Sequence, residues 1–559
     1  MTAEQTKIAE ESHVKAPWLN VYGVVPPHLD YPDCTMYEAV ERCAGTYPNH
    51  TAYVFMGRKT TYRAMAAEID LCARALKATG VRPGDRITMA MPNCPQAVIM
   101  FYAINLVGAT ANMIHPLSSE KEIEFYLKES GSIFAVTLDQ FYHKFEAIRQ
   151  NVTLDNIILA SIPDALSKPV RVGYMLTEGR KQAKIPKDAP VLRWNEFLRR
   201  GRGYHWTYRA ERRAGDEAVI LYSGGTTGVT KGIQLTNLNF NALGKQIIAT
   251  NPMFRPGDKM LAVMPMFHGF GLGVSIHSML VSGGCCILVP RFTPDSYAKL
   301  LLKYRCNLIA GVPTLYEALL RLPKMKNADL SCLKGVYSGG DSLSVELKKR
   351  FDQFLFDHHA TIQVREGYGL TECVTASCLT PYHISREGSI GIPFPDTYYK
   401  IVEHGTQKEV PYGTEGEICL SGPTVMMGYL HHPEETAQTL QTHEDGLAWV
   451  HTGDLGYMDP DGFVYFRQRL KRMIVTSGYN VYPSQMEVKA FVMLKPGVSA
   501  NEETKDVLMT YIRKNVAKYA LPYDIEFRAE LPKTLVGKVA YRVLEEEELK
   551  KLSETAQEQ

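Results

Sequence analysis

The sequence predicts an α/β protein with a large N-terminal domain, built from several α/β subdomains, and a small α+β C-terminal domain. Its 559 residues exceed what one hydrophobic core usually supports, so we expect at least two domains. Strand-sized apolar runs alternate with helix-sized segments from residue 35 to about residue 417, and short strands with glycine-rich turns follow. We therefore assign residues 1–468 to the large domain and residues 469–559 to the small one.

The alternating part divides into two blocks. In the first, a helix over 62–80 leads through an RPGD turn into a strand over 86–91. A strand is expected over 218–222, and the second block follows it with strands expected at 259–264, 285–289, 308–310 and 335–338. Because helix-sized segments separate these strands, parallel sheets covered by helices are the natural architecture. The basic segment 199–213, which contains two glycines, is interpreted as a surface connection between the blocks.

Composition and charge exclude several classes of function. The formal net charge is +2 and no long basic run is present, so nucleic acid is not an expected partner. The eleven cysteines form no CxxC pair, which disfavours zinc sites and a disulfide framework. The N-terminus lacks a secretory signal, and the apolar window 97–114 contains asparagines and a glycine, so we interpret that window as a buried helix and turn. We expect a cytoplasmic protein; peripheral membrane contact stays open, as does the choice between monomer and homodimer.

A glycine-rich loop, SGGTTGVTKG over 223–232, follows directly after the predicted strand 218–222. Glycines let backbone N–H groups approach an anion closely, and hydroxyls and an ammonium group add donors and charge. The loop therefore suits a polyphosphate. Considered without the rest of the sequence, it could also be a flexible surface turn. In a Walker A loop, GxxxxGK[ST], the lysine directly follows a glycine and precedes serine or threonine. Here Lys231 stands three residues after Gly228 and is followed by Gly232, so the loop is not a Walker A loop.

This loop is similar to the phosphate-binding signature of the adenylate-forming superfamily, which includes acyl-CoA synthetases, firefly luciferase and the adenylation domains of peptide synthetases. Seven further motifs follow in that superfamily's order, and the resemblance covers nearly the whole chain. They are FHGFGL at 267–272, SGGD at 338–341, GYGLTE at 367–372, HTGD at 451–454, RLK at 469–471, GYNVYP at 478–483 and PKTLVGK at 532–538.

The resemblance implies a set of phosphate-binding residues, since adenylation brings a carboxylate to the α-phosphate while pyrophosphate leaves. In the loop these are Ser223, Gly224, Thr226, Thr227, Gly228 and Lys231. Thr371 would bond the α-phosphate, and Glu372, with Thr226, would hold Mg²⁺. Lys538 would reach the carboxylate and the α-phosphate during adenylation, whereas Lys533 is read as merely exposed.

A second set is implied for the nucleoside. Asp454 would accept from both ribose hydroxyls, and Arg469 would donate to the same sugar. The adenine would lie between the backbone of Ser338, Gly339 and Gly340 and the ring of Tyr368, with Gly369 beside it. Asp341, which departs from the small residue common in fatty acyl members, would accept from the adenine amine.

The acyl side is less fully specified. The FHG stretch at 267–269 lacks the aspartate that pairs an amino-acid ammonium in peptide synthetases, so a simple carboxylic acid is favoured. His268 is interpreted as a gate or wall residue rather than a base, because a carboxylate needs no deprotonation. Small residues at Gly269, Gly271 and Gly273 are expected to leave room for an extended apolar acyl group.

Members of the superfamily use one site for two half-reactions by rotating the small domain. Lys471 matches the hinge, and Gly478 and Tyr479 would line a tunnel for the pantetheine arm of CoA. One departure lies just beyond, where Val488 is followed at once by Lys489, although relatives usually carry a few tens of residues between these stretches. A true deletion there, or an omitted segment, would affect CoA docking more than adenylation.

The sequence therefore predicts an AMP-forming ligase of a carboxylic acid and CoA, with ATP, Mg²⁺ and CoA as cofactors and a medium- or long-chain fatty acid as substrate. An aryl acid, or a carrier protein in place of CoA, is the alternative. A nucleotide-binding relative without turnover is a third hypothesis.

Overall fold

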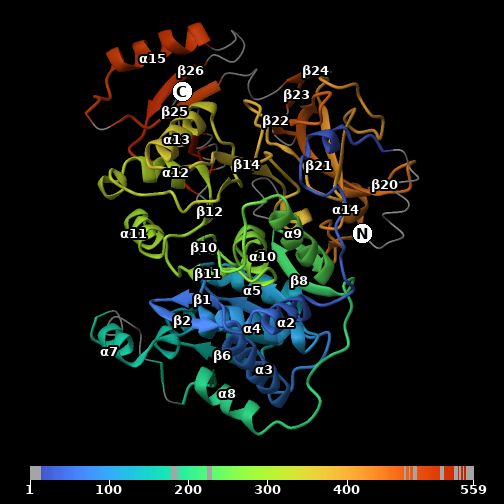
Figure 1. The fold of residues 1–559 in the computed structure, drawn as a ribbon, viewed down its shortest axis with the longest axis vertical. Helices are drawn as coiled ribbons and strands as arrows, with labels where there is room; N and C mark the ends of the chain where they lie inside the picture. The colour runs from blue at the N-terminus through green and yellow to red at the C-terminus, as the bar shows by residue number, and fades with distance from the viewer. Residues whose placement is uncertain are drawn as a thin grey trace, which may run out of the picture.

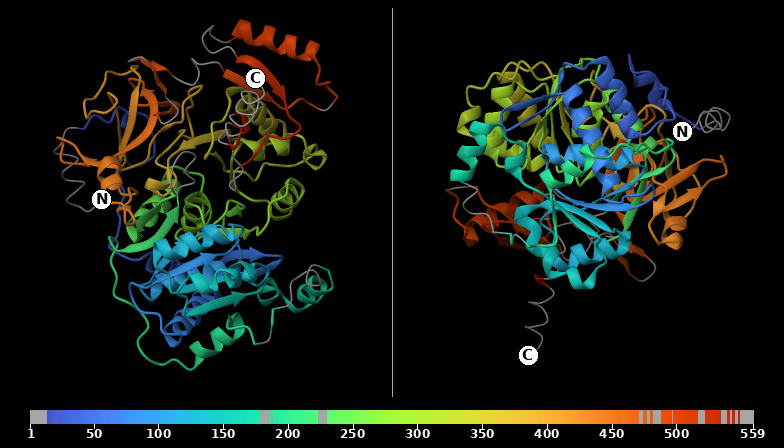
Figure 2. Two further views of the ribbon diagram at one scale, coloured as in Figure 1. Left: turned by 180° about the vertical axis from the view of Figure 1, so that it is seen from behind. Right: turned by 90° about the horizontal axis from the view of Figure 1, so that it is seen from below.

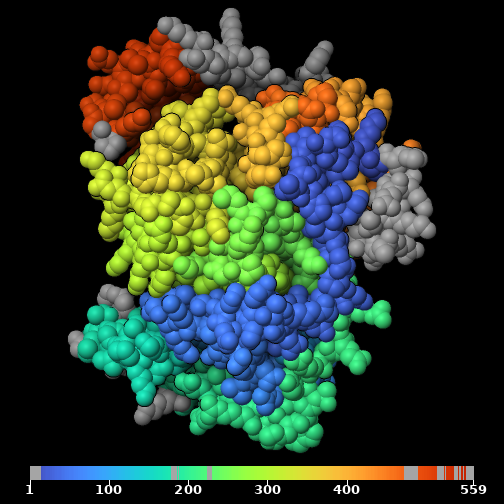
Figure 3. Space-filling view, in the orientation of Figure 1, coloured from blue at the N-terminus to red at the C-terminus, as the bar shows by residue number. Residues whose placement is uncertain are grey.

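The computed structural model describes residues 14–177, 185–186, 188–222, 230–470, 474–476, 479–481, 488–495, 497–515, 522–533, 539–540, 543–544 and 547–548. Figure 1 places helices α2 to α8, in blue to blue-green, at one end of the molecule, with the later α/β part above them and the last elements at the opposite end. The space-filling view of Figure 3 shows the same order of colours on this face. The second view of Figure 2 looks along this axis from below.

An eight-stranded sheet forms the first α/β part, in the order β19-β9-β8-β4-β3-β5-β6-β7. The strands between β8 and β7 are parallel, and most of their residues are buried on both faces. The strands are β3 (Arg86–Ala90), β4 (Thr110–Met113), β5 (Phe134–Leu138), β6 (Asn156–Ala160), β7 (Leu192–Arg193), β8 (Glu217–Tyr222), β9 (Gly232–Thr236) and β19 (Gly428–Tyr429). The helices of this part are α2 (Met36–Thr46), α3 (Tyr62–Ala78), α4 (Pro95–Leu106), α5 (Glu120–Ser130), α6 (Tyr142–Ala147), α7 (Lys168–Leu176) and α8 (Trp194–Arg202).

Helix α4 confirms the interpretation of the apolar window. Every residue of α4 is buried, and the chain then turns into β4. A helix that is apolar on all sides belongs in the middle of a protein core as well as in a bilayer. Among the helices that the structure describes, none is long and apolar enough to cross a membrane.

The interpretation of 199–213 as a surface connection is wrong for its first part. Residues 199–202 form the last turn of α8, which packs on α3. A Cβ on Gly201 would lie 2.5 Å from the Leu71 carbonyl oxygen, so glycine is what allows the two helices to approach. The rest of the segment is irregular, and Trp206 within it is exposed.

A nine-stranded sheet forms the second α/β part, in the order β16-β15-β14-β13-β12-β10-β11-β1-β2. It confirms the predicted parallel strands, because β1, β11, β10, β12, β13 and β14 are parallel neighbours in that order. Its strands are β1 (Thr51–Phe55), β2 (Arg58–Thr61), β10 (Lys259–Ala262), β11 (Cys285–Leu288), β12 (Leu308–Gly311), β13 (Gly335–Ser338), β14 (Val364–Tyr368), β15 (Cys378–Leu379) and β16 (Ile392–Pro393). Its helices are α9 (Asn237–Ala249), the π-helix η6 (Phe270–His277), α10 (Ser278–Leu280), α11 (Pro294–Tyr304), α12 (Pro313–Leu320) and α13 (Val345–Asp357).

An antiparallel five-stranded sheet follows, and it begins at Tyr398, earlier than the expected change of pattern near residue 417. It consists of β17 (Tyr398–Val402), β18 (Gly416–Ser421), β20 (Leu440–Thr442), β21 (Ala448–Met458) and β22 (Val464–Arg469), with α14 (Pro433–Thr439) beside it. Short turns of 3₁₀ helix connect elements throughout: η1 (Pro17–Val21), η2 (Asp139–Phe141), η3 (Arg149–Asn151), η4 (Ile162–Ala165), η7 (Pro323–Met325) and η8 (Thr371–Cys373).

The last described elements are β23 (Ile474–Thr476), β24 (Tyr479–Val481), β25 (Val488–Val492), α15 (Glu502–Asn515) and β26 (Pro522–Phe527). Strand β25 runs through the Val488–Lys489 joint and pairs in parallel with β26. The boundary at residue 469 and the shortening after Val488 both stay predictions.

Candidate active site

Several predicted site residues lie outside the described part of the chain: Ser223, Gly224, Thr226, Thr227, Gly228, Lys471, Gly478 and Lys538. For Tyr479 only its place in β24 is described. The two ends of the glycine-rich loop are nevertheless fixed, because β8 and β9 form an antiparallel pair in which Tyr222 opposes Gly232. The loop therefore connects two strands whose ends lie side by side.

The TE pair of GYGLTE lies where β14 has ended. Thr371 is buried, and Glu372 continues the short helix η8. Val374, just after it, has φ +67° and ψ −56°, and its neighbours close a hydrogen bond of 2.8 Å from the Thr375 N–H to the Cys373 carbonyl. This is a tight γ-turn, which is strained for a β-branched residue, and such strain gathers at functional sites.

The Glu372 carboxylate contacts a residue that no motif predicted. Its Oε1 accepts a hydrogen bond of 2.7 Å from the Tyr429 hydroxyl. Tyr429 stands in β19, which pairs with β9 at the end of the glycine-rich loop. Burial, with the charge of Glu372 as the second cause, raises the pKa of the Tyr429 phenol, so it is a hydrogen-bond donor at neutral pH.

Lys231 lies over the ring of the same tyrosine. Its Nζ is 4.9 Å from the centre of the Tyr429 ring and 3.4 Å from Glu435 Oε1. The structure thus brings together Lys231, Tyr429 and Glu372, which are far apart in the sequence. A cation over the ring and a carboxylate at its hydroxyl can take up a phosphate chain and its metal ion.

The predicted nucleoside residues also come together. The Tyr368 hydroxyl donates to Asp454 Oδ2 at 2.6 Å, and Arg469 Nε lies 3.0 Å from Asp454 Oδ1. Arg469 and Asp454 are paired residues of β22 and β21. Asp454 is 1% exposed, and burial raises its pKa although Arg469 and Tyr368 favour the charged form.

The SGGD stretch begins at the end of β13, beside β14. The Ser338 hydroxyl is buried, and within the described chain it has no hydrogen-bond partner. Gly340 has φ +79°, which favours glycine, and Asp341 is exposed with its Oδ1 accepting from the Ser342 N–H. A buried hydroxyl without a partner at the tip of a strand fits a ligand that supplies the missing hydrogen bond.

Glu366 and Gly369 each fix a backbone segment beside the candidate nucleoside site. Glu366 Oε1 accepts from the Leu343 N–H at 3.2 Å, and burial raises the pKa of Glu366 to about 7. Gly369 is required by packing, because a Cβ there would lie 2.4 Å from the Thr375 carbonyl oxygen. The backbone of Tyr368 and Gly369 is thereby held against the strained turn.

The expectation that three glycines open an acyl pocket is wrong. A Cβ on Gly269 would lie 1.8 Å from the Val374 carbonyl oxygen, and one on Gly271 would lie 2.1 Å from the Pro265 carbonyl oxygen. A Cβ on Gly273 would lie 2.7 Å from Leu243 Cδ2. The glycines allow η6 to pack closely against its surroundings, so the space at their Cα atoms is already filled.

His268 lies just before η6, and its Nδ1 accepts from the Phe270 N–H at 3.2 Å. The neighbouring Phe267 ring is 4.4 Å from the ring of His115. The His268 contact is compatible with a wall or gate residue, and this role stays a prediction.

Fold and site together define an α/β protein in which polar groups at and just after the carboxyl ends of the parallel strands β13 and β14, a usual place for ligands in such sheets, contact groups of the antiparallel β21–β22 and β9–β19 pairs. The profile of AMP-binding enzymes matches residues 40–430, and that of the AMP-binding enzyme C-terminal domain matches residues 481–538. The chain therefore belongs to the AMP-binding enzyme family.

Individual relatives agree with this assignment. A long-chain-fatty-acid–CoA ligase of Bacillus subtilis is 34% identical, over 95% of this chain and 98% of its own length. One of Salmonella typhimurium is 32% identical, over 96% of this chain and 98% of its own length. The anthranilate CoA ligase AuaEII, in complex with anthranoyl-AMP, has the same fold, with a TM-score of 0.80 at 24% identity, over 94% of this chain and 99% of its own. ATP-bound MatB from Rhodopseudomonas palustris has a TM-score of 0.76 at 24% identity, over 92% of this chain and 99% of its own.

These findings confirm, at the level of the family, the predictions of an adenylate-forming enzyme, of an acid–thiol ligase and of ATP, Mg²⁺ and CoA as cofactors. They also confirm the predicted α/β fold class.

Proposed function

We propose that this chain joins a medium- or long-chain fatty acid to CoA, with cleavage of ATP to AMP and pyrophosphate. The observation that carries the proposal is the convergence, at adjoining strand ends, of a Glu372–Tyr429–Lys231 group and a Tyr368–Asp454–Arg469 group. The first has the charges for a phosphate chain with its metal, and the second has the acceptors and donors for a sugar.

In the first half-reaction a carboxylate oxygen of the acid attacks the α-phosphorus of ATP. The bond from that phosphorus to the bridging oxygen breaks, and pyrophosphate leaves with the electron pair. Lys231, the loop hydroxyls of Thr226 and Thr227, and the Thr371 hydroxyl bind phosphate oxygens, and Lys538 neutralises charge between the two anions. No base is needed, since the acid is already ionised, which leaves His268 as a wall or gate.

Glu372, with Thr226, is the proposed Mg²⁺ ligand. One of its oxygens is held by Tyr429 at 2.7 Å, which orients the carboxylate and leaves the second oxygen for the metal. When bound, Mg²⁺ supplies positive charge to the phosphate oxygens. The nucleoside is placed by Asp454 and Arg469 at the ribose, with Ser338, Gly339, Gly340 and Asp341 on one face of the adenine and Tyr368 and Gly369 on the other.

In the second half-reaction the thiol sulfur of CoA attacks the acyl carbonyl carbon, the thiol proton is released, and AMP leaves. Rotation about Lys471 removes Lys538 and brings Gly478 and Tyr479 to the pantetheine arm. A carrier protein is the alternative acceptor, and an aryl acid is the alternative substrate. The two bacterial relatives are long-chain-fatty-acid–CoA ligases, which supports an aliphatic acid.

A peripheral membrane contact belongs to the same proposal. Helix α7 exposes Val172, Met175 and Leu176 by 60%, 50% and 58%, and their i, i+3, i+4 spacing puts them on one face. Arg171 fixes the helix to η4 by donating to the Pro163 carbonyl at 2.8 Å. Residues 168–184 carry five basic side chains and one acidic one, which favours an anionic bilayer, where long-chain acids also partition.

The membrane contact is tested by sedimentation with vesicles of anionic and of neutral lipid. Leu176→Glu should abolish binding to anionic vesicles, whereas Phe356→Ser, which removes a 73% exposed ring elsewhere, should leave it unchanged. Equal binding of the Leu176→Glu variant would contradict the assignment. The cytoplasmic location and the monomeric or homodimeric state are also part of this proposal.

The activity is tested by incubation with ATP, Mg²⁺, CoA and a panel of aliphatic and aryl acids, with nucleotide products separated by chromatography. AMP formation that is fastest with long aliphatic acids is the expected result. Formation of ADP, or no nucleotide cleavage with any acid, would overturn the proposal.

The two-state use of the site is tested with Lys538→Ala, and with Lys533→Ala as the matched control. Lys533 is described and exposed. The first variant should lose acid-dependent pyrophosphate exchange but still convert supplied acyl-adenylate to thioester, and the control should do both. Equal loss of both steps in Lys538→Ala would contradict the two-state mechanism.

A further inference from the structure

Strand β21 is interrupted within the HTGD motif. Cys419 of β18 opposes His451 of β21, whereas Glu417 opposes Leu455. Ile418 alone therefore faces the three residues between His451 and Leu455, and β21 bulges there. Gly453 in the bulge has φ +67°. The bulge turns the chain immediately before Asp454.

Two polar side chains hold the bulge to β18. Glu417 Oε1 accepts from the Gly453 N–H at 2.9 Å. The Thr452 hydroxyl donates to the Ile418 carbonyl at 2.7 Å and accepts from the Asp454 N–H at 3.1 Å. These bonds fix the backbone that leads into Asp454, so the direction of the Asp454 carboxylate depends on Glu417 and on Thr452.

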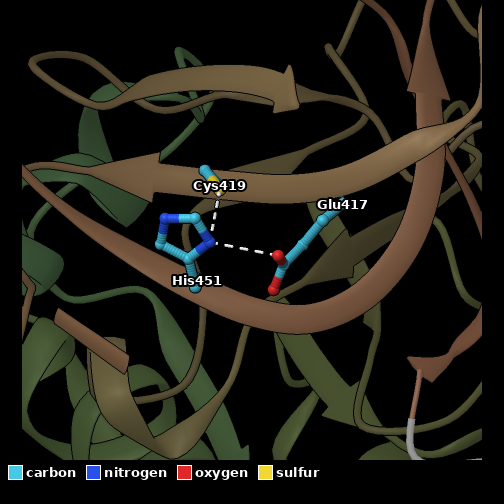
Figure 4. Close-up of side chains that lie close together, drawn as sticks. All are labelled: Glu417, Cys419 and His451. Atoms are coloured by element: carbon cyan, nitrogen blue, oxygen red, sulfur yellow. Dashed lines mark hydrogen bonds and ion pairs between the residues drawn. The ribbon is translucent and has the colours of Figure 1, made fainter. Parts of the chain in front are cut away.

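Glu417 is itself held from a second side. Its Oε2 lies 3.0 Å from His451 Nδ1, as Figure 4 shows, and His451 Nε2 lies 2.9 Å from His443 Nε2. Burial works against the charge of Glu417, but the bonds from His451 and Gly453 outweigh it and lower the pKa of this carboxyl. Burial and Lys400 lower the pKa of His443 to about 4, so His443 is neutral near pH 7.

The grouping of Glu417, Cys419 and His451 also has the donor types of a metal site. Both oxygens of Glu417 are already engaged by N–H groups, and burial raises the pKa of the Cys419 thiol well above its usual value. The geometry is that of a satisfied hydrogen-bond network.

We propose that Glu417 is a positioning residue for ATP, acting through the Gly453 bulge on the carboxylate of Asp454. This rests on the proposed role of Asp454 as the ribose ligand. A carboxylate that is 5% exposed and bonded on both sides keeps the bulge in one conformation. Asp454 then meets the sugar without reorganisation, which raises affinity for ATP.

The test uses calorimetric ATP binding to the full chain, together with binding of 2′-deoxy-ATP and of ATP to Asp454→Ala. Glu417→Ala should weaken ATP binding by about tenfold and reduce the preference for ATP over 2′-deoxy-ATP. Glu417→Gln keeps an acceptor for the Gly453 N–H and should stay within about threefold of the native protein. In the Asp454→Ala background, Glu417→Ala should have no further effect on ATP affinity.

Two variants keep the test decisive. Cys419→Ala shortens a neighbouring buried side chain but leaves the bulge bonds, and should not change ATP affinity. Thr452→Val removes the other bulge bonds and should reproduce the loss if Glu417→Ala does not fold. Unchanged ATP affinity in Glu417→Ala would overturn the inference; if that variant does not fold, unchanged affinity in Thr452→Val would do so. Losses of ATP affinity that add up in the double variant Glu417→Ala, Asp454→Ala would also overturn it. A native protein that binds ATP but forms no AMP would overturn the proposed function and leave this inference testable.

Discussion

The nucleoside side and the phosphate side of the candidate site are built differently. On the nucleoside side, Asp454 is almost fully buried and is fixed by Tyr368, Arg469 and the Glu417 bulge. On the phosphate side, the Lys231 side chain is 23% exposed and pairs at 3.4 Å with Glu435, which is 37% exposed. The contrast lies in Asp454 itself, since its partner Arg469 is half-exposed. Removing a partner from a buried carboxylate destabilises a protein strongly, whereas an exposed pair contributes little.

This difference separates two tasks. A sugar can be recognised by a carboxylate that is already held in place, because its hydroxyls add hydrogen bonds to a preformed arrangement. A polyphosphate brings several charges, and the cation that meets it must be released from its earlier partner at low cost. A half-exposed Glu435 is such a partner, since a phosphate can displace it.

The largest expected effect lies on the phosphate side, and its absence would mean that this side does not depend on the charge of Glu372. Glu372→Gln keeps an acceptor for Tyr429 but removes the charge proposed to hold Mg²⁺, so the rate of AMP formation should fall by about 100- to 1,000-fold. A titration with Mg²⁺ should also shift to higher concentration. Tyr429→Phe removes the hydrogen bond without the charge and should cost less than about tenfold. Equal losses in the two variants would contradict a metal role for Glu372.

The second effect concerns Glu366, on the nucleoside side of the site, and is measured as the free energy of unfolding. The folded pKa of Glu366 is raised to about 7 from 4.5, so the folded state binds the proton more tightly than the unfolded state. Its stabilisation is full below the unfolded pKa and is lost as pH rises from about 4.5 to about 7. Glu366→Gln should therefore raise stability at pH 8, by on the order of 3 kcal/mol, and have little effect at pH 4.

Urea unfolding of both proteins across this pH range measures that difference. Asp341→Asn is the matched control, because Asp341 lies in the same stretch but is exposed. A Glu366→Gln variant that is less stable than the native protein at pH 8 would mean that the carboxylate is needed in its charged form.

Much of this fold follows from local pattern. A continuous apolar run with only neutral polar interruptions predicted α4, and alternating apolar segments predicted the parallel strands. The motifs also gave Thr371, Glu372, Asp454 and Arg469 as candidate site residues, because the residues of each motif are neighbours along a short stretch of chain. What could not be predicted depends on packing between distant segments.

Tyr429 and Glu417 are examples of residues that the sequence did not reveal. Tyr429 reaches Glu372 only because β19 pairs with β9, and Glu417 reaches Gly453 only across the β18–β21 pair. The role of the glycines at the start of η6 and within it could not be predicted for the same reason. Glycine in a sequence indicates a missing side chain, but only the structure shows that the Val374 carbonyl already fills that space at Gly269.

The smallest expected effect tests whether the phosphate-side cation is held by an exchangeable partner. Glu435→Gln should lower the KM for ATP by about two- to threefold, because Lys231 no longer has to leave a carboxylate. The gain should shrink at high salt, which screens exposed charges. Glu434→Gln removes the same charge from the adjacent, exposed position and is the matched control. An equal decrease in KM in both variants would mean that ATP binding responds to net charge alone. An increase in KM for Glu435→Gln would mean that Glu435 orients Lys231 toward the phosphate chain and does not compete with the phosphate for Lys231.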